Sequence, residues 1–142
     1  MSNVLAITIC FAFLALGLWH FYMAFAGGTG ESAAVPRLDG KPLFVPSAGA
    51  TVAVGVVLLL CATLVAGTSG LVSLGLPPRP LSWLSYATAL ALLARAVGEF
   101  KYVGFFKRVR GSRFATMDTL VYSPLCLMLS AGVAWVAIDQ TA

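Results

Sequence analysis

Apolar residues fill four long runs of this chain, and polar residues gather in the segments between them. The runs cover about residues 4–26, 48–70, 81–99 and 119–138. A helix needs about 20 apolar residues to cross the hydrocarbon of a bilayer, and each run is near that length. Hydrophobic periodicity adds little, because a helix that is apolar on all sides has no distinct polar face. The length of the runs therefore predicts four transmembrane helices.

The composition agrees with a membrane protein. Of the 142 residues, 60% are hydrophobic and only 10% are charged, whereas a soluble domain carries about 25% charged residues. The first run has no basic residue before it and is long for a signal peptide, so we expect it to remain as a helix. We expect one domain over residues 1–142, an all-α integral membrane four-helix bundle.

The segments between the runs differ in character. Residues 27–47 contain three prolines and four glycines, which exclude a continuous helix, and Ser47 suits the start of the second helix. The next connection, LGLPPRP, is a short, stiff turn. The third crowds charge, since eight of the 14 charged residues lie between positions 95 and 118. In the fourth run, Pro124 removes a backbone hydrogen bond and predicts a bend.

The distribution of basic residues predicts the orientation. In a four-span bundle, the connections after the first and third helices share one side of the membrane. Together with Arg95 they hold eight of the nine basic residues, and the other side has only Arg79. The positive-inside rule then places both long connections in the cytoplasm and both termini outside it. Trp83 and Trp135 fall near the outer helix ends, as expected of interfacial aromatic residues.

Small residues four apart predict where helices pack closely. In the second and third runs these pairs are Gly49 with Ala53, Ala66 with Gly70, and Ala87 with Ala91.

The last of these pairs continues into a charged pair on the same helical face. Ala87, Ala91, Arg95 and Glu99 follow one another at steps of four residues. We expect the two alanines to pack against a neighbouring helix. Arg95 and Glu99 either pair with each other at the end of the third helix or form a polar binding site that opens to the cytoplasm.

Two further candidates for binding lie in the first long connection. In PRLDGKP, Arg37 and Asp39 predict a turn that an Asp side chain stabilises before Gly40. The alternative is that this turn forms a lid over the cytoplasmic face of the bundle.

His20, Glu99 and Asp118 are the acid–base candidates, because all three are expected at similar depth near the cytoplasmic boundary. His20 either hydrogen-bonds to a neighbouring helix or handles protons. Asp118 either caps the start of the fourth helix or joins this group. The sequence has one histidine, which excludes a bis-histidine haem within one subunit and argues against a multi-histidine metal site. We therefore expect no metal and no cofactor.

The segment KYVGFFKRVRGSRF alternates aromatic and basic residues. A soluble chain with this pattern would suggest nucleic-acid binding, but here the segment connects two membrane helices on the expected cytoplasmic side. Contact with anionic lipid head groups explains it better, and we expect no nucleic acid partner. This lipid-facing basic segment contains Lys101, Lys107, Arg108, Arg110 and Arg113.

Four segments resemble an uncharacterised family of small bacterial four-helix membrane proteins, classified as a domain of unknown function. They are WHFYMAFAGG, AVPRLDGKPLFVPS, RAVGEFKYVGFFKRVR and FATMDTLVYSPLCL, and they span residues 19–127. The resemblance implies a multi-pass protein of the bacterial inner (plasma) membrane. It implies no activity for any residue.

Three functions remain open on this basis. The leading one is a small membrane protein without a catalytic motif that binds lipids or partner helices, as an accessory subunit or homo-oligomer. The second is an oligomeric transporter or channel for small solutes or protons. The third is a membrane enzyme that acts on a lipid-soluble substrate at the cytoplasmic interface through His20, Glu99 and Asp118.

Overall fold

The computed structural model describes residues 2–26, 35–38 and 41–140. Four segments of this described chain are long and apolar enough to cross a membrane, which confirms the all-α four-helix membrane fold. The last of them runs from Arg113 to Asp139 through three consecutive helical elements. In chain order the elements are α1 (Ser2–Ala26), β1 (Arg37–Leu38), β2 (Lys41–Pro42), α2 (Ala48–Thr68), α3 (Pro78–Val97), α4 (Arg113–Met117), the π-helix η1 (Asp118–Tyr122) and α5 (Ser123–Asp139).

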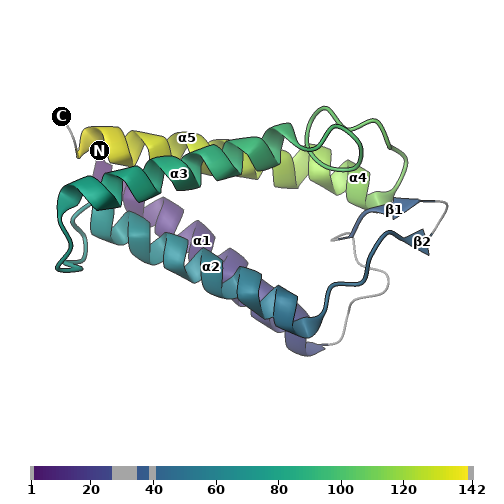
Figure 1. The fold of residues 1–142 in the computed structure, drawn as a ribbon, viewed down its shortest axis with the longest axis horizontal. Helices are drawn as coiled ribbons and strands as arrows, with labels where there is room; N and C mark the ends of the chain where they lie inside the picture. The colour runs from purple at the N-terminus through teal and green to yellow at the C-terminus, as the bar shows by residue number, and fades with distance from the viewer. Residues whose placement is uncertain (1, 27–34, 39–40, 141–142) are drawn as a thin grey trace.

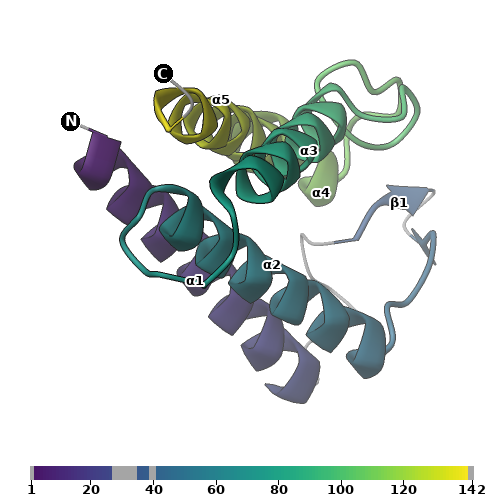
Figure 2. The ribbon, with the colours of Figure 1, turned by 60° about the vertical axis from the view of Figure 1, so that its left-hand side comes forward.

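The four long helices form two antiparallel pairs. Figures 1 and 2 show α1 beside α2, and α3 beside α5. The pairs meet at the end of the molecule where both termini lie, which we call the closed end, and they diverge toward the two long connections, which we call the open end (Figure 1). Both long connections therefore share one side of the bundle, as the sequence predicts.

The helix starts follow from local capping. The side chain of Ser47 accepts a hydrogen bond from the amide of Ala50, as expected of an N-cap. Helix α3 starts at Pro78, three residues before the predicted run, because proline at the first helical position needs no amide partner. The last helix begins at Arg113, where Ser112 is the N-cap and accepts from the amide of Ala115. The prediction that Asp118 caps this helix is wrong, since Asp118 lies inside it.

The last helix widens in the middle. In η1 the amide of Ser123 bonds to the carbonyl of Asp118, five residues back, instead of four. Pro124 follows directly and has no amide hydrogen for the α-helical bond to Leu120. The structure therefore has a wide π turn directly before Pro124, and the predicted bend stays a prediction. Single π turns of this kind are frequent at functional sites.

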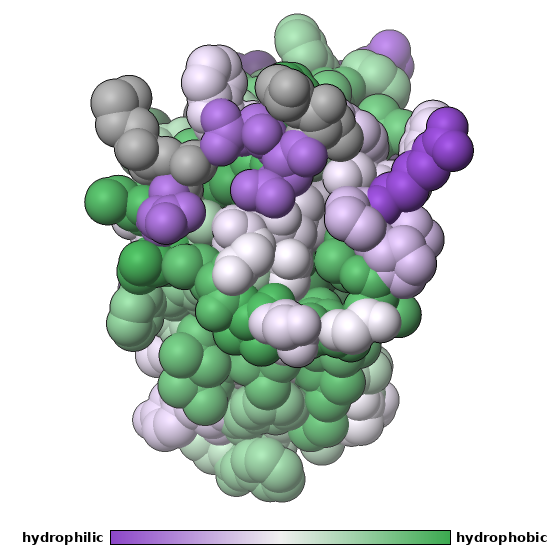
Figure 3. All heavy atoms as spheres, turned by 90° about the vertical axis from the view of Figure 1, so that its left-hand side faces the viewer, coloured by the Kyte–Doolittle hydropathy of each residue, from purple (hydrophilic) through white to green (hydrophobic). Residues whose placement is uncertain are grey.

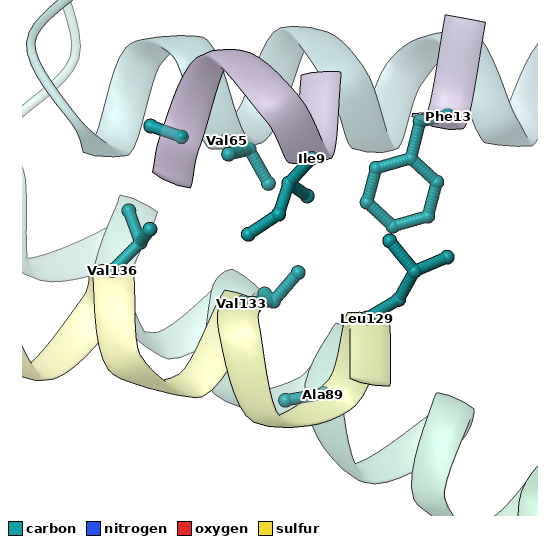
Figure 4. Packing of buried hydrophobic residues seen from close by; sticks show 8 residues of the cluster. Ile9, Phe13, Val65, Ala89, Leu129, Val133 and Val136 are labelled. Atoms are coloured by element: carbon teal, nitrogen blue, oxygen red, sulfur yellow. The ribbon is translucent and has the colours of Figure 1, made fainter. Parts of the chain in front are cut away.

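The hydrophobic core lies toward the closed end, between the two helix pairs. Figure 4 shows side chains of α1 and α5 pointing toward one another, with Phe13 against Leu129 and Ile9 near Val133. Phe13 and Val133 are fully buried. Dispersion contacts hold this core, because lipid tails already supply an apolar environment for exposed side chains. Hydrophobic residues also cover the lower half of the end-on view in Figure 3, on the side of α1 and α2, as expected of a surface in contact with hydrocarbon.

Glycines allow close helix contacts, but at positions other than those predicted. A Cβ on Gly17 of α1 would lie 3.2 Å from the carbonyl oxygen of Gly55 on α2, so these helices approach closely there. Ala87 and Ala91 are exposed, and a Cβ added at Gly49 would have no neighbouring atom within 4 Å. The prediction that Ala87 and Ala91 pack against a neighbouring helix is therefore wrong for the single chain.

Hydroxyl groups supply hydrogen bonds between helices, both across the two pairs and within one pair. Thr68 Oγ1 lies 2.9 Å from Ser85 Oγ, which joins α2 to α3. Ser130 Oγ donates to the carbonyl of Ala89 at 2.7 Å, which joins α5 to α3. These bonds satisfy polar groups that have no access to water in hydrocarbon.

Candidate functional site

A buried carboxylate and two cations meet at the open end. Asp118, at the start of η1, is fully buried. Its Oδ1 accepts a hydrogen bond from Arg95 Nη2 at 2.8 Å, and its Oδ2 accepts from Lys107 Nζ at 3.0 Å. The amide of Gly104 also donates to Oδ2 at 2.7 Å. Asp118 therefore joins the end of α3, the basic segment and the last helix.

Lys107 belongs to this cluster and does not face lipid. It is 2% exposed, and its ammonium donates to Gly104 O at 2.9 Å, Asp118 Oδ2 at 3.0 Å and Thr119 Oγ1 at 2.6 Å. An ammonium has three hydrogens, so all its donors are used. The prediction of Lys107 as part of the lipid-facing surface is wrong, because the burial of Asp118 requires a charged partner.

Two glycines bring the basic segment back onto the end of α3. Gly98 and Gly104 both have positive φ, at 86° and 88°. A Cβ on Gly98 would collide with the carbonyl of Val103, and a Cβ on Gly104 would collide with the carbonyl of Val97. The amide of Phe105 then bonds to Ala96 O at 2.9 Å. This close backbone contact places the amide of Gly104 against Asp118.

Glu99 has a different role from the predicted one. Its Oε1 accepts a hydrogen bond from the amide of Tyr102 at 2.6 Å, which holds the turn that follows α3. Arg95 pairs with Asp118 instead. The predicted Arg95–Glu99 pair is therefore wrong, and the reason is tertiary: the folded-back segment supplies a carboxylate that a view of α3 alone does not contain.

A cavity of about 400 Å³ lies between the diverging helix pairs. All four long helices contribute to its wall, together with α4 and η1. Most of the lining is apolar or aromatic, and Arg95 is its only lysine, arginine, aspartate or glutamate among the described residues. The lining residues are Phe13, Leu16, Trp19, His20, Met23, Val54, Leu58, Leu92, Arg95, Phe114, Tyr122, Leu125, Cys126 and Leu129.

The three acid–base candidates do not share this cavity. His20 lines it, whereas Glu99 and Asp118 are absent from its wall. The Nδ1 atom of His20 lies 2.7 Å from the carbonyl oxygen of Leu16 on the same helix, so the expected bond to a neighbouring helix is not the one formed. A carbonyl only accepts, so this nitrogen carries the hydrogen and Nε2 is left for other contacts.

Of the two candidates in the first long connection, Arg37 is described, and it is absent from the cavity wall. Arg37 is half-buried in β1, which pairs with β2 in a two-stranded antiparallel hairpin. Asp39 lies outside the described residues, so its predicted turn stays a prediction.

The rest of the basic segment faces outward. Its four other basic side chains are exposed, and Phe100 and Phe106 beside them are 54% and 64% exposed. This surface has the mixture of cations and aromatic rings that suits the head-group boundary of a bilayer. The exposed cations are Lys101, Arg108, Arg110 and Arg113.

Sequence reasoning missed both the Lys107–Asp118 pair and the cavity. Lys107 lies among the exposed cations in the sequence, and nothing in the sequence marks it as the buried one. The described residues also contain no group of three or more His, Cys, Asp or Glu side chains placed to hold a metal ion.

Comparison with known proteins places the chain in a family. A family model described as "Protein of unknown function (DUF3995)" matches residues 13–133, which covers both the charge cluster and the cavity wall. No curated protein and no solved structure matches the chain. The matched region is most of the chain, and the protein is therefore a member of the DUF3995 family of proteins of unknown function.

Proposed function

We propose that this multi-pass membrane protein binds a lipid-soluble molecule in the cavity between its two helix pairs and is not an enzyme. The observation that carries the proposal is the cavity itself, about 400 Å³ with a mainly apolar wall and a few polar groups. Sites for small molecules have this size and lining.

The polar groups of the cavity lie toward one end of it. Helix α1 runs from the closed end to the open end, so His20 lies nearer the open end than Phe13 does. Arg95 and Tyr122 also lie near the open end, at the end of α3 and the start of the last helix. A molecule with one polar end and one apolar end matches this gradient.

A transport function has less support. Beyond Phe13 and Leu129, the described residues between the helix pairs form the packed core around Ile9 and Val133. A solute path would have to cross this core. The hydroxyl groups farther along bond to each other or to backbone carbonyls, as Thr68 does with Ser85. A binding site that ends at the core needs no such path.

Catalysis by the candidate acid–base residues also has less support, because only His20 reaches the cavity wall. The carboxylate of Asp118 already accepts from three donors. A carboxylate held in this way is a poor general base for a substrate outside the cluster.

We further propose that the open end faces the cytoplasm and that its exposed cations contact anionic lipids. The charge bias of the long connections supports this orientation. A reporter that is active only outside the cytoplasm, fused to the C-terminus, is expected to be active. The same reporter within residues 98–112 is expected to be inactive, and the opposite pattern would reverse the orientation.

Native mass spectrometry in a mild non-ionic detergent tests ligand binding. We expect one lipid-soluble molecule per chain, and the same spectra report the oligomeric state and any partner membrane protein. Leu58→Trp puts a larger side chain on the cavity wall and should remove the bound mass. Leu60→Trp is the matched control, because Leu60 is on the same helix but 62% exposed. A bound mass that Leu58→Trp leaves unchanged, or no bound mass in the parent protein, would refute cavity binding.

A further inference from the structure

We infer that the ligand of the cavity is an anionic amphiphile, with a carboxylate or phosphate head held by Arg95 and an acyl or similar chain between the helix pairs. This inference rests on the proposed function and specifies the chemistry of the same site.

The first argument is the balance of charge in the buried cluster. Two cations, Arg95 and Lys107, surround the single carboxylate of Asp118. The cluster therefore carries one positive charge that no described partner within it neutralises. An unbalanced charge at the edge of hydrocarbon is costly, so an anion that reaches it gains a large share of its binding free energy there.

The second argument is where the extra charge is accessible. Lys107 is 2% exposed and uses all three of its ammonium hydrogens within the cluster. The side chain of Arg95 is 37% exposed and forms part of the cavity wall. The surplus charge is therefore available to a ligand at Arg95 and not at Lys107.

The third argument is that Arg95 has unused donors. A guanidinium has five N–H groups, and the structure gives Arg95 one hydrogen bond, from Nη2 to Asp118. Its Nη1 atom is buried and has no hydrogen-bond partner among the described residues. A small movement of the guanidinium toward a head group would satisfy these donors. The planar fork of arginine fits the two oxygens of a carboxylate or phosphate.

The fourth argument is the absence of competing acids at the wall. None of the described lining residues is an aspartate or a glutamate. The nearest acid in sequence, Glu99, is exposed and accepts from the amide of Tyr102. Asp118, the acid that Arg95 binds, is fully buried and is also absent from the cavity wall. An anionic head group that reaches Arg95 from the cavity would therefore meet no carboxylate on its wall.

The shape of the cavity selects an amphiphile over a small anion. Residues 13–23 of α1 line one side, and at 1.5 Å per residue this is roughly 15 Å of helix. That length is mainly apolar and continues from the level of Arg95 toward the core. Free phosphate would leave it empty, whereas an acyl chain fills it.

Quenching of tryptophan fluorescence by brominated amphiphiles tests the head-group preference. Trp19 lines the cavity and is 56% exposed, whereas Trp83 and Trp135 lie near the closed end and are absent from the cavity wall. Replacing both with phenylalanine leaves Trp19 as the reporter. The probes are dibrominated stearic acid, stearyl alcohol, lysophosphatidic acid and lysophosphatidylcholine, each titrated at alkaline pH in the same neutral detergent. The stearyl pair differs only in the head group.

We expect the acid to quench Trp19 with a midpoint about tenfold lower than that of the alcohol, as one charged hydrogen-bonded contact predicts. The two phosphate probes separate a phosphomonoester from a zwitterionic head. Tighter quenching by lysophosphatidic acid than by stearic acid would identify phosphate as the preferred anion. The reverse order would identify carboxylate. Unlabelled inorganic phosphate is expected not to compete.

Variants then locate the contact. Arg95→Gln should remove the difference between acid and alcohol, and Arg95→Lys should restore part of it. Arg79→Gln, which removes the cation near the closed end, should leave the difference unchanged. The comparison of probes in the parent protein needs no variant, so poor folding of Arg95→Gln does not leave the inference without a test.

The two levels of the proposal fail in different ways. If acid and alcohol quench Trp19 with equal midpoints, and Leu58→Trp abolishes the quenching by both, the anionic head group is overturned and cavity binding is retained. If every probe quenches Trp19, and this quenching neither saturates nor changes in Leu58→Trp, the probes reach Trp19 from the detergent micelle at the protein surface. That result would overturn cavity binding itself.

Discussion

The two ends of the bundle are stabilised in different ways. At the closed end, apolar side chains of α1 and α5 interlock. The polar links across helices that the described residues form there are hydroxyl bonds, such as that between Thr68 and Ser85, and a bond from the thiol of Cys10 to the carbonyl of Ala62. At the open end, the helix pairs separate, and a buried carboxylate ties three segments together. Dispersion contacts are many and individually weak, whereas the charge cluster concentrates its free energy in a few atoms. Single substitutions in the charge cluster should therefore have much larger effects than single substitutions in the apolar core.

The largest effect is expected from Asp118→Asn. The variant keeps the size of the side chain but removes the only carboxylate of the cluster, so Lys107 stays buried without a counter-charge. Breaking a buried pair in this way costs about 3–5 kcal/mol. We expect a large loss of thermal stability in detergent, measured as the midpoint of unfolding. A midpoint equal to that of the parent protein would mean that the cluster is not a stabilising centre.

A double variant distinguishes lost attraction from uncompensated charge. Lys107→Met in the Asp118→Asn background removes the buried ammonium that has no counter-charge, so part of the lost stability should return. No recovery would indicate that hydrogen bonds from Arg95 and Gly104, rather than the Lys107 charge, account for the loss.

The next effect is expected from Gly104→Ala. The residue has positive φ, and its Cβ would collide with the backbone of Val97, so the basic segment could not fold back onto α3. Strain of this kind costs on the order of 2 kcal/mol, measured by the same unfolding midpoint. Gly111→Ala is the matched control, because Gly111 has a φ of 93° but nothing within 4 Å of an added Cβ. Equal losses in both variants would mean that backbone conformation alone, not the close approach, matters.

A smaller effect is expected from Val133→Ala at the closed end. Val133 is fully buried in the core. In a bilayer the unfolded helices remain in lipid, so the transfer free energy of the lost methyl groups is small and mainly the packing contacts are lost. We expect a loss of about 1 kcal/mol, measured by the unfolding midpoint. A loss as large as that of Asp118→Asn would contradict the contrast between the two ends.

The contrast also explains which features the sequence could predict. Four runs of sufficient length identified the four spans, because length in hydrocarbon is set by bilayer thickness and not by tertiary contacts. The hydropathy pattern predicts too late a start for the last helix, since its first turns contain Arg113 and Asp118, which lower the local hydropathy. Ser112 after Gly111 was an available capping signal.

The charge cluster was harder to predict, because it depends on how one connection folds. The sequence marks Arg95 as a costly charge near the membrane boundary, but the partner that it predicts, Glu99, follows one helical turn later. Asp118 is 23 residues away in sequence. The approach of Gly98 to Gly104 and the widened turn at η1 determine whether Asp118 reaches Arg95. None of these long-range contacts leaves a periodic pattern in the sequence.

The smallest effect is expected from Glu99→Gln, and it tests the revised pairing directly. Glu99 is exposed, and its one described contact is the hydrogen bond from the amide of Tyr102. The amide oxygen of glutamine can accept the same bond, so we expect a change within about 0.5 kcal/mol. Asp118→Asn and Glu99→Gln each remove one carboxylate charge with little change in shape, which makes them a matched pair in the unfolding measurement. If Arg95 relied on Glu99, the two variants would lose similar stability. A large loss for Asp118→Asn with almost none for Glu99→Gln requires instead that Asp118 on the last helix, and not Glu99, balances the charge of Arg95 on α3. The open end is then held together by a tertiary contact between these two helices and not by a contact next to Arg95 in the sequence.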